Sequence, residues 1–150
     1  MMSKYADYST FILRVFFGLA FLIAGLDKVF TYSMTKGMFQ TMFGNSIGGY
    51  MLILAIIIEL AGGLALLLGI FTRIAALLLA LTMVVAFVVT FDIGQATHFV
   101  GTLREIIVMN TAGRNTAVNF AYFAALLSLV FSGTKVVAVK PNKESEDFKF

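Results

Sequence analysis

Four long apolar runs constrain this chain more than any other feature of its sequence. They extend over residues 8–30, 47–71, 74–91 and 117–135 and contain few charges. The hydrocarbon core of a bilayer is about 30 Å thick, so a helix needs roughly 20 apolar residues to cross it. Because no water inside the bilayer can satisfy an open backbone, each run is expected to be helical. The sequence therefore predicts an all-α membrane protein, a bundle of four transmembrane helices.

The amino-acid composition also indicates that lipid surrounds this chain. Of the 150 residues, 60% are hydrophobic and only 13% are charged, about half the usual charged share. We expect one membrane domain, residues 1–139, followed by a charged and flexible tail, residues 140–150, which opens with the only proline and has no apolar period. The run from Tyr8 is too long for a typical signal peptide and is interpreted as a mature helix.

The connections between the runs differ in length. Gly69 followed by Thr72 and Arg73 is a natural break, and a tight turn at Thr72–Arg73 makes the second and third spans an antiparallel hairpin. Apolar residues recur at helical spacing from Ser33 to Phe43 and from His98 to Met109, which predicts a short interfacial helix in each outer connection. Two interpretations stay open for these helices: they rest on the lipid surface, or they wall an apolar ligand site.

Four spans place both termini on one side of the membrane. The basic residues near the membrane slightly favour that side as the inner one. Those on the side of the termini are Lys4, Arg73, Lys135, Lys140 and Lys143, and those on the other side are Lys28, Lys36, Arg104 and Arg114. The expected location is the plasma membrane, with several crossings and cytoplasmic termini.

The side-chain inventory excludes several classes of site. There is no cysteine, which excludes disulfides, thiolate metal sites and iron–sulfur clusters, and His98 alone cannot make a multi-histidine metal site. We predict no metal site and no covalently bound cofactor. The net charge of +3 comes from basic residues dispersed at span ends, so the lipid bilayer, and not nucleic acid, is the expected partner.

Two ionisable residues lie inside predicted spans. Arg14 is about two turns into the first span, and Glu59 is in the middle of the second. Each costs a few kcal/mol in lipid unless it is paired or used. We predict that they face each other across the two helices, although their side chains lean apart, so contact needs a tilt or a bridging water. Such a pair either neutralises two charges or forms a proton- or substrate-handling site.

One stripe of the first span carries Arg14, Gly18, Phe21, Gly25 and Lys28. Its two glycines would let this helix approach the second span closely. Phe21 between them is interpreted either as ordinary packing or as a ring that lines a quinone pocket. Arg104, in the outer segment 92–114, lies on a solvated face from which it could contact a quinone or an anion.

These residues resemble the DoxX/DoxD-like membrane proteins. The similarity covers about residues 10–90. Its more specific block is Glu59-Leu-Ala-Gly62-Gly63-Leu-Ala-Leu-Leu-Leu-Gly69-Ile-Phe-Thr72-Arg73, and the other is Leu13-Arg14, Gly18 and Phe21-Leu-Ile-Ala-Gly25-Leu-Asp-Lys28.

The resemblance implies a four-helix subunit of a quinone-linked oxidoreductase, such as thiosulfate:quinone oxidoreductase. It points to Glu59 and Arg14 as catalytic residues and to Lys28 and Arg73 as quinone-binding residues, with Arg104 added from its position near the outer surface. With no redox centre of its own, such a subunit would take electrons from a partner that carries a metal or a flavin. Two other functions stay open, a non-catalytic accessory or assembly subunit and a small proton-coupled transporter. Other membrane subunits or further copies of this chain are the expected protein partners.

Overall fold

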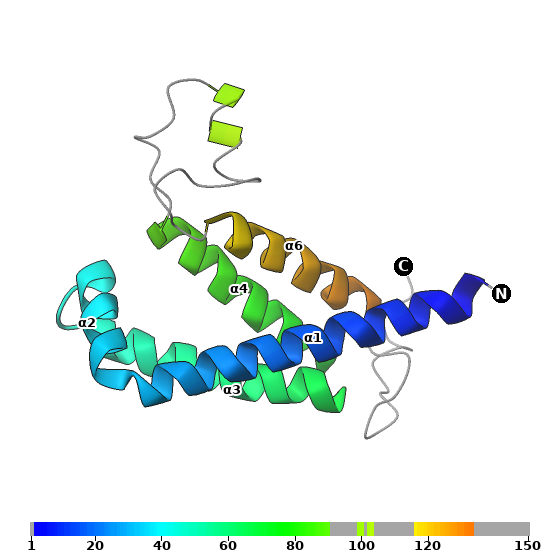
Figure 1. The fold of residues 1–150 in the computed structure, drawn as a ribbon, viewed down its shortest axis with the longest axis horizontal. Helices are drawn as coiled ribbons and strands as arrows, with labels where there is room; N and C mark the ends of the chain where they lie inside the picture. The colour runs from blue at the N-terminus through cyan, green and yellow to red at the C-terminus, as the bar shows by residue number, and fades with distance from the viewer. Residues whose placement is uncertain (1, 91–98, 101, 104–115, 134–150) are drawn as a thin grey trace.

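The computed structural model describes residues 2–90, 99–100, 102–103 and 116–133, and this part of the chain is helical throughout apart from its turns. Five helices carry it (Figure 1): α1 Met2–Phe30, α2 Tyr32–Phe43, α3 Gly48–Leu68, α4 Thr72–Thr90 and α6 Thr116–Ser132. Three of them, α1 from Tyr8 onward, α3 and α4, are long and apolar enough to cross a membrane, and α6 is a shorter apolar helix. The first three predicted spans and the interfacial helix at 33–43 are confirmed as helices. Of the segment 98–109, the described residues 99–100 and 102–103 are helical.

The helices associate as two pairs. α1 packs along α3, and α4 packs along α6. The short connection after α3 joins the pairs, and from that turn α3 and α4 diverge, while α2 lies across the far end of the α1–α3 pair (Figure 1). We call residues 62–80, around the turn, the closed half of the hairpin, and residues 48–59 with residues 81–90 the open half.

The turn between α3 and α4 lies earlier than the predicted Thr72–Arg73 turn. α3 ends at Leu68, and the following Gly69 adopts the left-handed conformation with φ 70°. The Ile70 N–H donates to the Ala65 carbonyl at 3.0 Å, a typical way of closing a helix end. Phe71 also has a positive φ, 48°, and α4 begins directly afterwards at Thr72. The predicted turn was therefore wrong by three residues, because the backbone reverses at the glycine and not at the polar pair.

The last helix is shorter than predicted. Residues 117–135 were expected to form the fourth span, but α6 ends at Ser132. Gly133 follows with φ 62°, and its N–H donates to the Leu129 carbonyl at 2.9 Å. A left-handed glycine is a common stop signal for a helix, and it is the reason why this one does not continue. The predicted tail, residues 140–150, lies outside the described residues.

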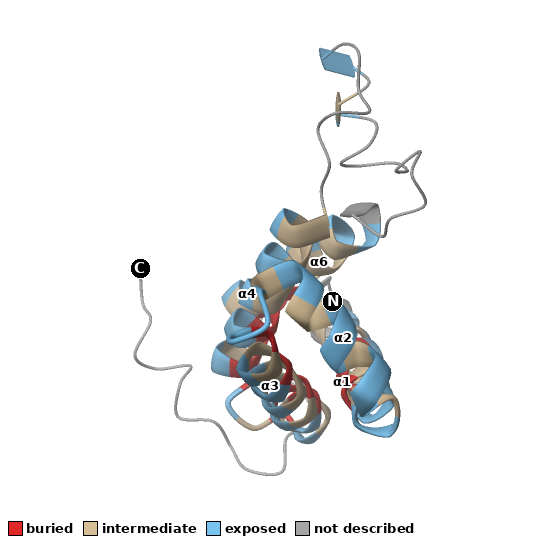
Figure 2. Cartoon of the chain, turned by 90° about the vertical axis from the view of Figure 1, so that its left-hand side faces the viewer, coloured by how far each residue is buried: buried red, intermediate tan, exposed pale blue. Residues whose placement is uncertain are grey.

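The main buried cluster joins the closed half of the hairpin to α1 and α6. Among the described residues, its members come from four helices: Phe17, Phe21, Leu66, Ala75, Ala76, Leu79, Ala80, Leu126 and Leu129. Tyr122 of α6 meets the rings of Phe17 and Phe21 edge-on, with centroids 5.0 and 6.0 Å away. In Figure 2 the buried residues lie where the helices face one another. The packing interpretation of Phe21 is confirmed.

Glycines fix the register between α1 and α3. A Cβ atom placed on Gly63 would lie 2.9 Å from the Gly18 carbonyl oxygen and 3.0 Å from the Leu22 nitrogen. One placed on Gly25 would lie 2.8 Å from the Leu60 side chain. Backbones this close leave no room for a side chain, which is how small residues join helices in lipid. The predicted close approach of these two helices is confirmed.

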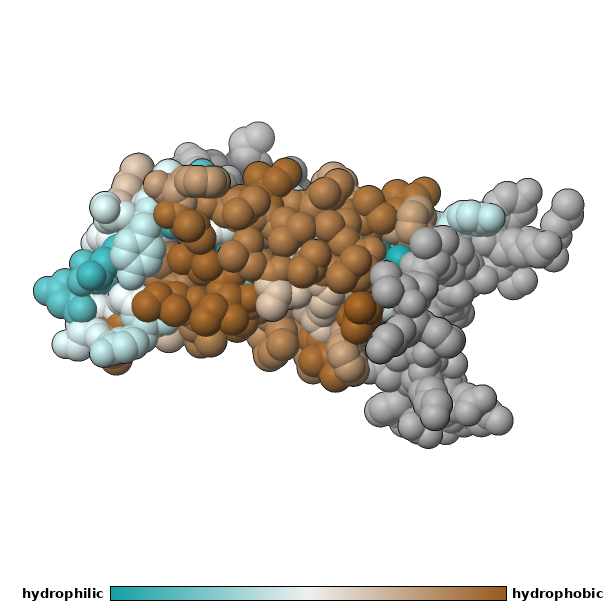
Figure 3. All heavy atoms as spheres, turned by 90° about the horizontal axis from the view of Figure 1, so that it is seen from below, coloured by the Kyte–Doolittle hydropathy of each residue, from teal (hydrophilic) through white to brown (hydrophobic). Residues whose placement is uncertain are grey.

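The surface carries an apolar belt. In Figure 3 hydrophobic side chains cover the middle of the molecule, and hydrophilic ones gather at one end. Many large apolar residues are exposed on every spanning helix, for example Ile23 of α1, Ile57 of α3 and Val88 of α4. Helix α2 has no buried residue, and Met34 on it is 73% exposed. Such a surface suits lipid and not water.

Candidate functional site: an apolar cavity beside a buried ion pair

A cavity of about 390 Å³ lies in the open half of the hairpin. Its walls come mainly from α2, α3 and α4, with one residue each from α1 and α6. The lining residues are Lys28, Phe39, Met42, Phe43, Met51, Leu54, Ala55, Ile58, Glu59, Leu78, Leu81, Thr82, Met83, Val85, Ala86, Val89, Thr90 and Asn119. Its size falls within the range of small-molecule sites, about 300–1,000 Å³.

The two halves of the hairpin differ in how closely α3 and α4 approach. In the closed half, a Cβ on Gly62 would lie 2.9 Å from the Leu79 side chain, so the two helices touch. Further from the turn α3 and α4 diverge (Figure 1), and Leu54 and Leu81 line the space between them. These two leucines are about half exposed while also lining the cavity. The cavity therefore opens sideways, on a face of the molecule that suits lipid.

Lys28 and Glu59 form an ion pair at the wall of this cavity. The lysine Nζ donates to Glu59 Oε2 at 2.8 Å and also contacts the Ala24 carbonyl at 3.4 Å. The Glu59 side chain is 6% exposed and that of Lys28 is 22% exposed. Lys28 lies in the last turn of α1, where a positive charge is also favoured by the helix dipole. The pair thus neutralises a carboxylate that would otherwise be isolated in the middle of α3.

The predicted pair between Arg14 and Glu59 is wrong. Within the described part of the chain, Glu59 bonds to Lys28 and not to Arg14. The glycine contacts explain the difference, since Gly25 lies against Leu60 and the Glu59 Cβ. This register brings Lys28, one turn beyond Gly25, to the carboxylate. Arg14 lies one turn beyond Gly18 in the opposite direction, roughly 21 Å along α1 from Lys28 at 1.5 Å per residue.

Arg14 and Arg73 belong to the other end of the bundle. Arg14 is 1% exposed, and its guanidinium lies 5.5 Å from the centre of the Phe11 ring. The Arg73 guanidinium lies against Gly133, where an added Cβ would be 2.8 Å from Nε. A cation beside the C-terminus of α6 is favoured by the helix dipole. Neither arginine lines the cavity, and Arg104 and His98 lie outside the described residues.

A second polar group lies at the outer part of the cavity. Asn119 Nδ2 of α6 approaches Thr90 Oγ1 of α4 at 3.5 Å, and that hydroxyl donates to the Ala86 carbonyl at 2.6 Å. Thr82, further in, donates to the Leu79 carbonyl at 2.7 Å. Sequence reasoning missed these residues. The signal that could have found them is Asn119, because an amide side chain inside an apolar run usually has a polar partner.

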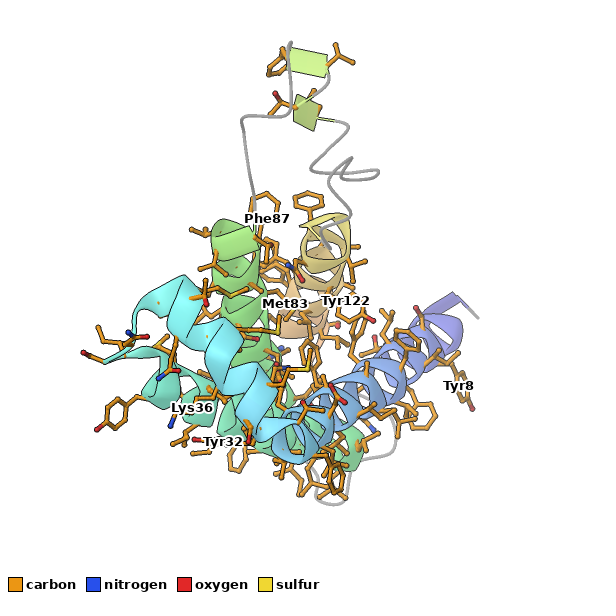
Figure 4. All side chains as sticks on the ribbon, turned by 60° about the vertical axis from the view of Figure 1, so that its left-hand side comes forward. Tyr8, Tyr32, Lys36, Met83, Phe87 and Tyr122 are labelled. Atoms are coloured by element: carbon orange, nitrogen blue, oxygen red, sulfur yellow. The ribbon has the colours of Figure 1, made fainter. Side chains whose placement is uncertain are left out.

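Three methionines make the walls adaptable. Met42, Met51 and Met83 come from α2, α3 and α4 respectively. In Figure 4, Met83 and Tyr122 lie in the space between the helix pairs. Tyr8, Tyr32 and Lys36 lie on the outside of the molecule. Unbranched thioether side chains reshape easily around a guest. With one ion pair and a mostly apolar lining, the arrangement suits a lipophilic molecule that carries a polar headgroup.

Comparison with known proteins agrees with a membrane location. The DoxX family profile matches residues 9–92. The chain is 30% identical over 108 residues to "Inner membrane protein YqjF" of Escherichia coli, covering 71% of this chain and 81% of that protein. It is 28% identical over 134 residues to "Putative oxidoreductase CatD" of Bacillus subtilis, covering 89% and 96%. No solved structure matches significantly.

Proposed function

This chain belongs to the DoxX family of membrane proteins, and from that premise we propose that it is a membrane subunit of a quinone-linked oxidoreductase. The observation that carries the proposal is the cavity beside Lys28 and Glu59. The name of the Bacillus subtilis relative supports an oxidoreductase role.

The cavity fits a quinone in shape and in chemistry. Its walls are apolar except at a few points, which suits a ring with an isoprenoid tail. The Lys28 ammonium has three protons, and its contacts with Glu59 and Ala24 leave capacity for a carbonyl oxygen of the ring. Quinones dissolve in the hydrocarbon core, and the half-exposed Leu54 and Leu81 provide an entrance from that side.

The redox chemistry requires a partner. A quinone accepts or releases two electrons, and this sequence, with no cysteine and one histidine, lacks the ligands of iron–sulfur and multi-histidine redox centres. We propose that a second subunit with a metal or a flavin exchanges electrons with the quinone held here. The resemblance to DoxD-like proteins makes thiosulfate the first electron donor to test.

The proposed topology has four spans. α6 has 17 residues, about 26 Å of helix at 1.5 Å per residue, slightly less than the bilayer core. It packs along α4 and completes the buried core, which supports its insertion beside the other three helices. Four crossings put both termini on one side of the plasma membrane, and the basic residues favour the cytoplasm.

Thermal unfolding in mild detergent tests quinone binding. Saturating quinone should raise the unfolding temperature, because a ligand that binds only the folded state stabilises it. Ala55→Phe fills the cavity and should remove the shift. Ala61→Phe on the same helix is the matched control, since Ala61 is exposed and does not line the cavity. No saturable shift in the unmodified protein, or an equal shift in the Ala55 variant, would contradict the proposal.

An accessory or assembly subunit is the second candidate. It is favoured by the exposed face of α6, which carries the small residues Ala121, Ala124 and Ser128. Small residues at this spacing let another helix pack closely in lipid. Gentle solubilisation from native membranes should then yield a larger complex that Ala124→Leu disrupts. A particle that is monomeric before and after the substitution would exclude this role.

A further inference from the structure

The ion pair with Lys28 uses only one oxygen of the Glu59 carboxylate, Oε2, and leaves Oε1 available to a ligand. We propose that the cavity selects a headgroup with a hydroxyl, so that it binds a quinol or another lipophilic phenol in preference to the oxidised quinone. This inference rests on the proposed function, since it concerns the same cavity, and it names the chemical form of ligand that the cavity prefers.

The first step is the hydrogen bonding of Glu59. An ionised carboxylate accepts through both oxygens and donates through neither. Oε2 accepts from Lys28 at 2.8 Å, and across the described ranges no other donor contacts the carboxylate. Oε1 is therefore an acceptor without a donor, on a side chain that is 6% exposed and lines the cavity. Oε1 can therefore be reached from the cavity by a donor on a bound molecule.

The second step is what the other polar residues of the cavity provide. The hydroxyl protons of Thr82 and Thr90 are already donated to the carbonyls of Leu79 and Ala86. The amide of Asn119 is directed to Thr90. None of these three side chains donates to Glu59, so the hydroxyl of a bound molecule can supply the donor.

The third step compares the two redox forms. A quinone has only carbonyl oxygens, which can accept from Lys28 but offer nothing to Oε1 and bring a second lone pair close to it. A quinol hydroxyl can donate to Glu59 Oε1 while its oxygen accepts from Lys28, so it uses both members of the pair. Hydrogen bonds to an ionised acceptor are about twice as strong as neutral ones. The difference favours the reduced form.

The test measures affinity and needs no turnover. A short-tailed benzoquinol, its dimethyl ether and the corresponding quinone are titrated anaerobically into the full-length protein in mild detergent. We expect the quinol to bind at least about tenfold more tightly than the ether or the quinone, the ratio that corresponds to one charge-assisted hydrogen bond of about 1.4 kcal/mol.

Glu59→Gln tests the role of the carboxylate. The amide keeps the size of the side chain, and with its oxygen on Lys28 its NH2 takes the place of Oε1. That group donates and does not accept, so the preference for the quinol should be lost or reversed in favour of the quinone. The variant Lys28→Met/Glu59→Leu removes both charges together, keeps the site apolar and should bind the three ligands equally. It serves as the second variant should the amide substitution disturb folding.

The outcomes separate this inference from the proposed function. Equal binding of quinol, ether and quinone that Ala55→Phe abolishes would overturn the hydroxyl preference and leave quinone binding in place. A tenfold preference that persists unchanged in both Glu59 variants would also overturn it, because the acceptor would lie elsewhere. Failure of all three ligands to bind would contradict the proposed function itself.

Discussion

The two halves of the α3–α4 hairpin differ in what their side chains allow. In the closed half, glycine and alanine bring the helices into contact, as Gly62 does against Leu79, and the buried core gathers there. In the open half the same two helices diverge, and a cavity lined by leucines, methionines and the Lys28–Glu59 pair lies between them. The comparison shows that one half of the hairpin packs closely and that the other leaves a cavity, which we propose receives a ligand.

The lipid environment determines what stabilises each half. A leucine gains little by moving from acyl chains into a protein interior, because both are apolar, so stability comes from close packing and from paired polar groups. The closed half supplies the packing. In the open half, the Lys28–Glu59 pair is the polar contact that keeps a carboxylate tolerable at the cavity wall.

Breaking the ion pair should have the largest effect. Lys28→Met leaves the Glu59 carboxylate buried without its partner, and removal of one member of a buried pair costs about 3–5 kcal/mol. We expect about 3 kcal/mol, the lower end, because the Lys28 side chain is 22% exposed. Unfolding of the variant by SDS in mixed micelles measures it.

The double variant Lys28→Met/Glu59→Leu is the control for that experiment. It should recover most of the lost stability, since neither charge remains to be compensated. A double variant as unstable as the single one would show that Lys28 acts through its packing and not through its charge.

Truncating leucines on α4 compares the two halves directly. Leu79 is fully buried in the closed half, and Leu81 is 52% exposed at the cavity. Leu79→Ala should cost about 2 kcal/mol, the low end for a leucine truncation because lipid supplies little transfer energy. Leu81→Ala should cost less than about 0.5 kcal/mol, as is usual for exposed positions. The same micellar unfolding assay applies, and equal losses would remove the distinction between the halves.

Adding one methyl group to a glycine should have the smallest effect. Gly63→Ala places a Cβ 2.9 Å from the Gly18 carbonyl, so α1 and α3 have to shift apart, at about 1 kcal/mol. Gly37→Ala in α2 meets no atom within 4 Å and should stabilise that helix by up to about 1 kcal/mol. We expect the two substitutions to shift the thermal unfolding temperature in opposite directions. A Gly63→Ala variant that is more stable would contradict the close contact between α1 and α3.

The helices could be predicted because their causes are local. Apolar runs of about 20 residues set the first three spans, and α1, α3 and α4 begin and end within a few residues of them, apart from the extension of α1 to Met2. The partner of Glu59 could not be predicted by counting depth along straight helices. Lys28 reaches it because the contact of Gly25 with Leu60 sets the register, and that contact depends on both backbones.

The rest of the cavity wall has a tertiary origin as well. Thr90 and Asn119 are 29 positions apart and meet only because α6 packs along α4. The arginines singled out as site residues, Arg14 and Arg73, lie at the opposite end of the bundle for the same reason. Their charge made them conspicuous in an apolar sequence, although charge alone does not say which cavity a side chain faces.

Photolabelling tests the central claim most directly, that the open half of the hairpin is a quinone site entered from the lipid. A quinone that carries a photoactivatable group is irradiated with the protein in bilayers, and the labelled residues are found by mass spectrometry. We predict adducts on cavity residues such as Leu54, Leu81 and Met83, suppressed by excess unlabelled quinone. Adducts spread evenly over lipid-facing residues such as Ile12 and Phe16, and unaffected by the competitor, would contradict it.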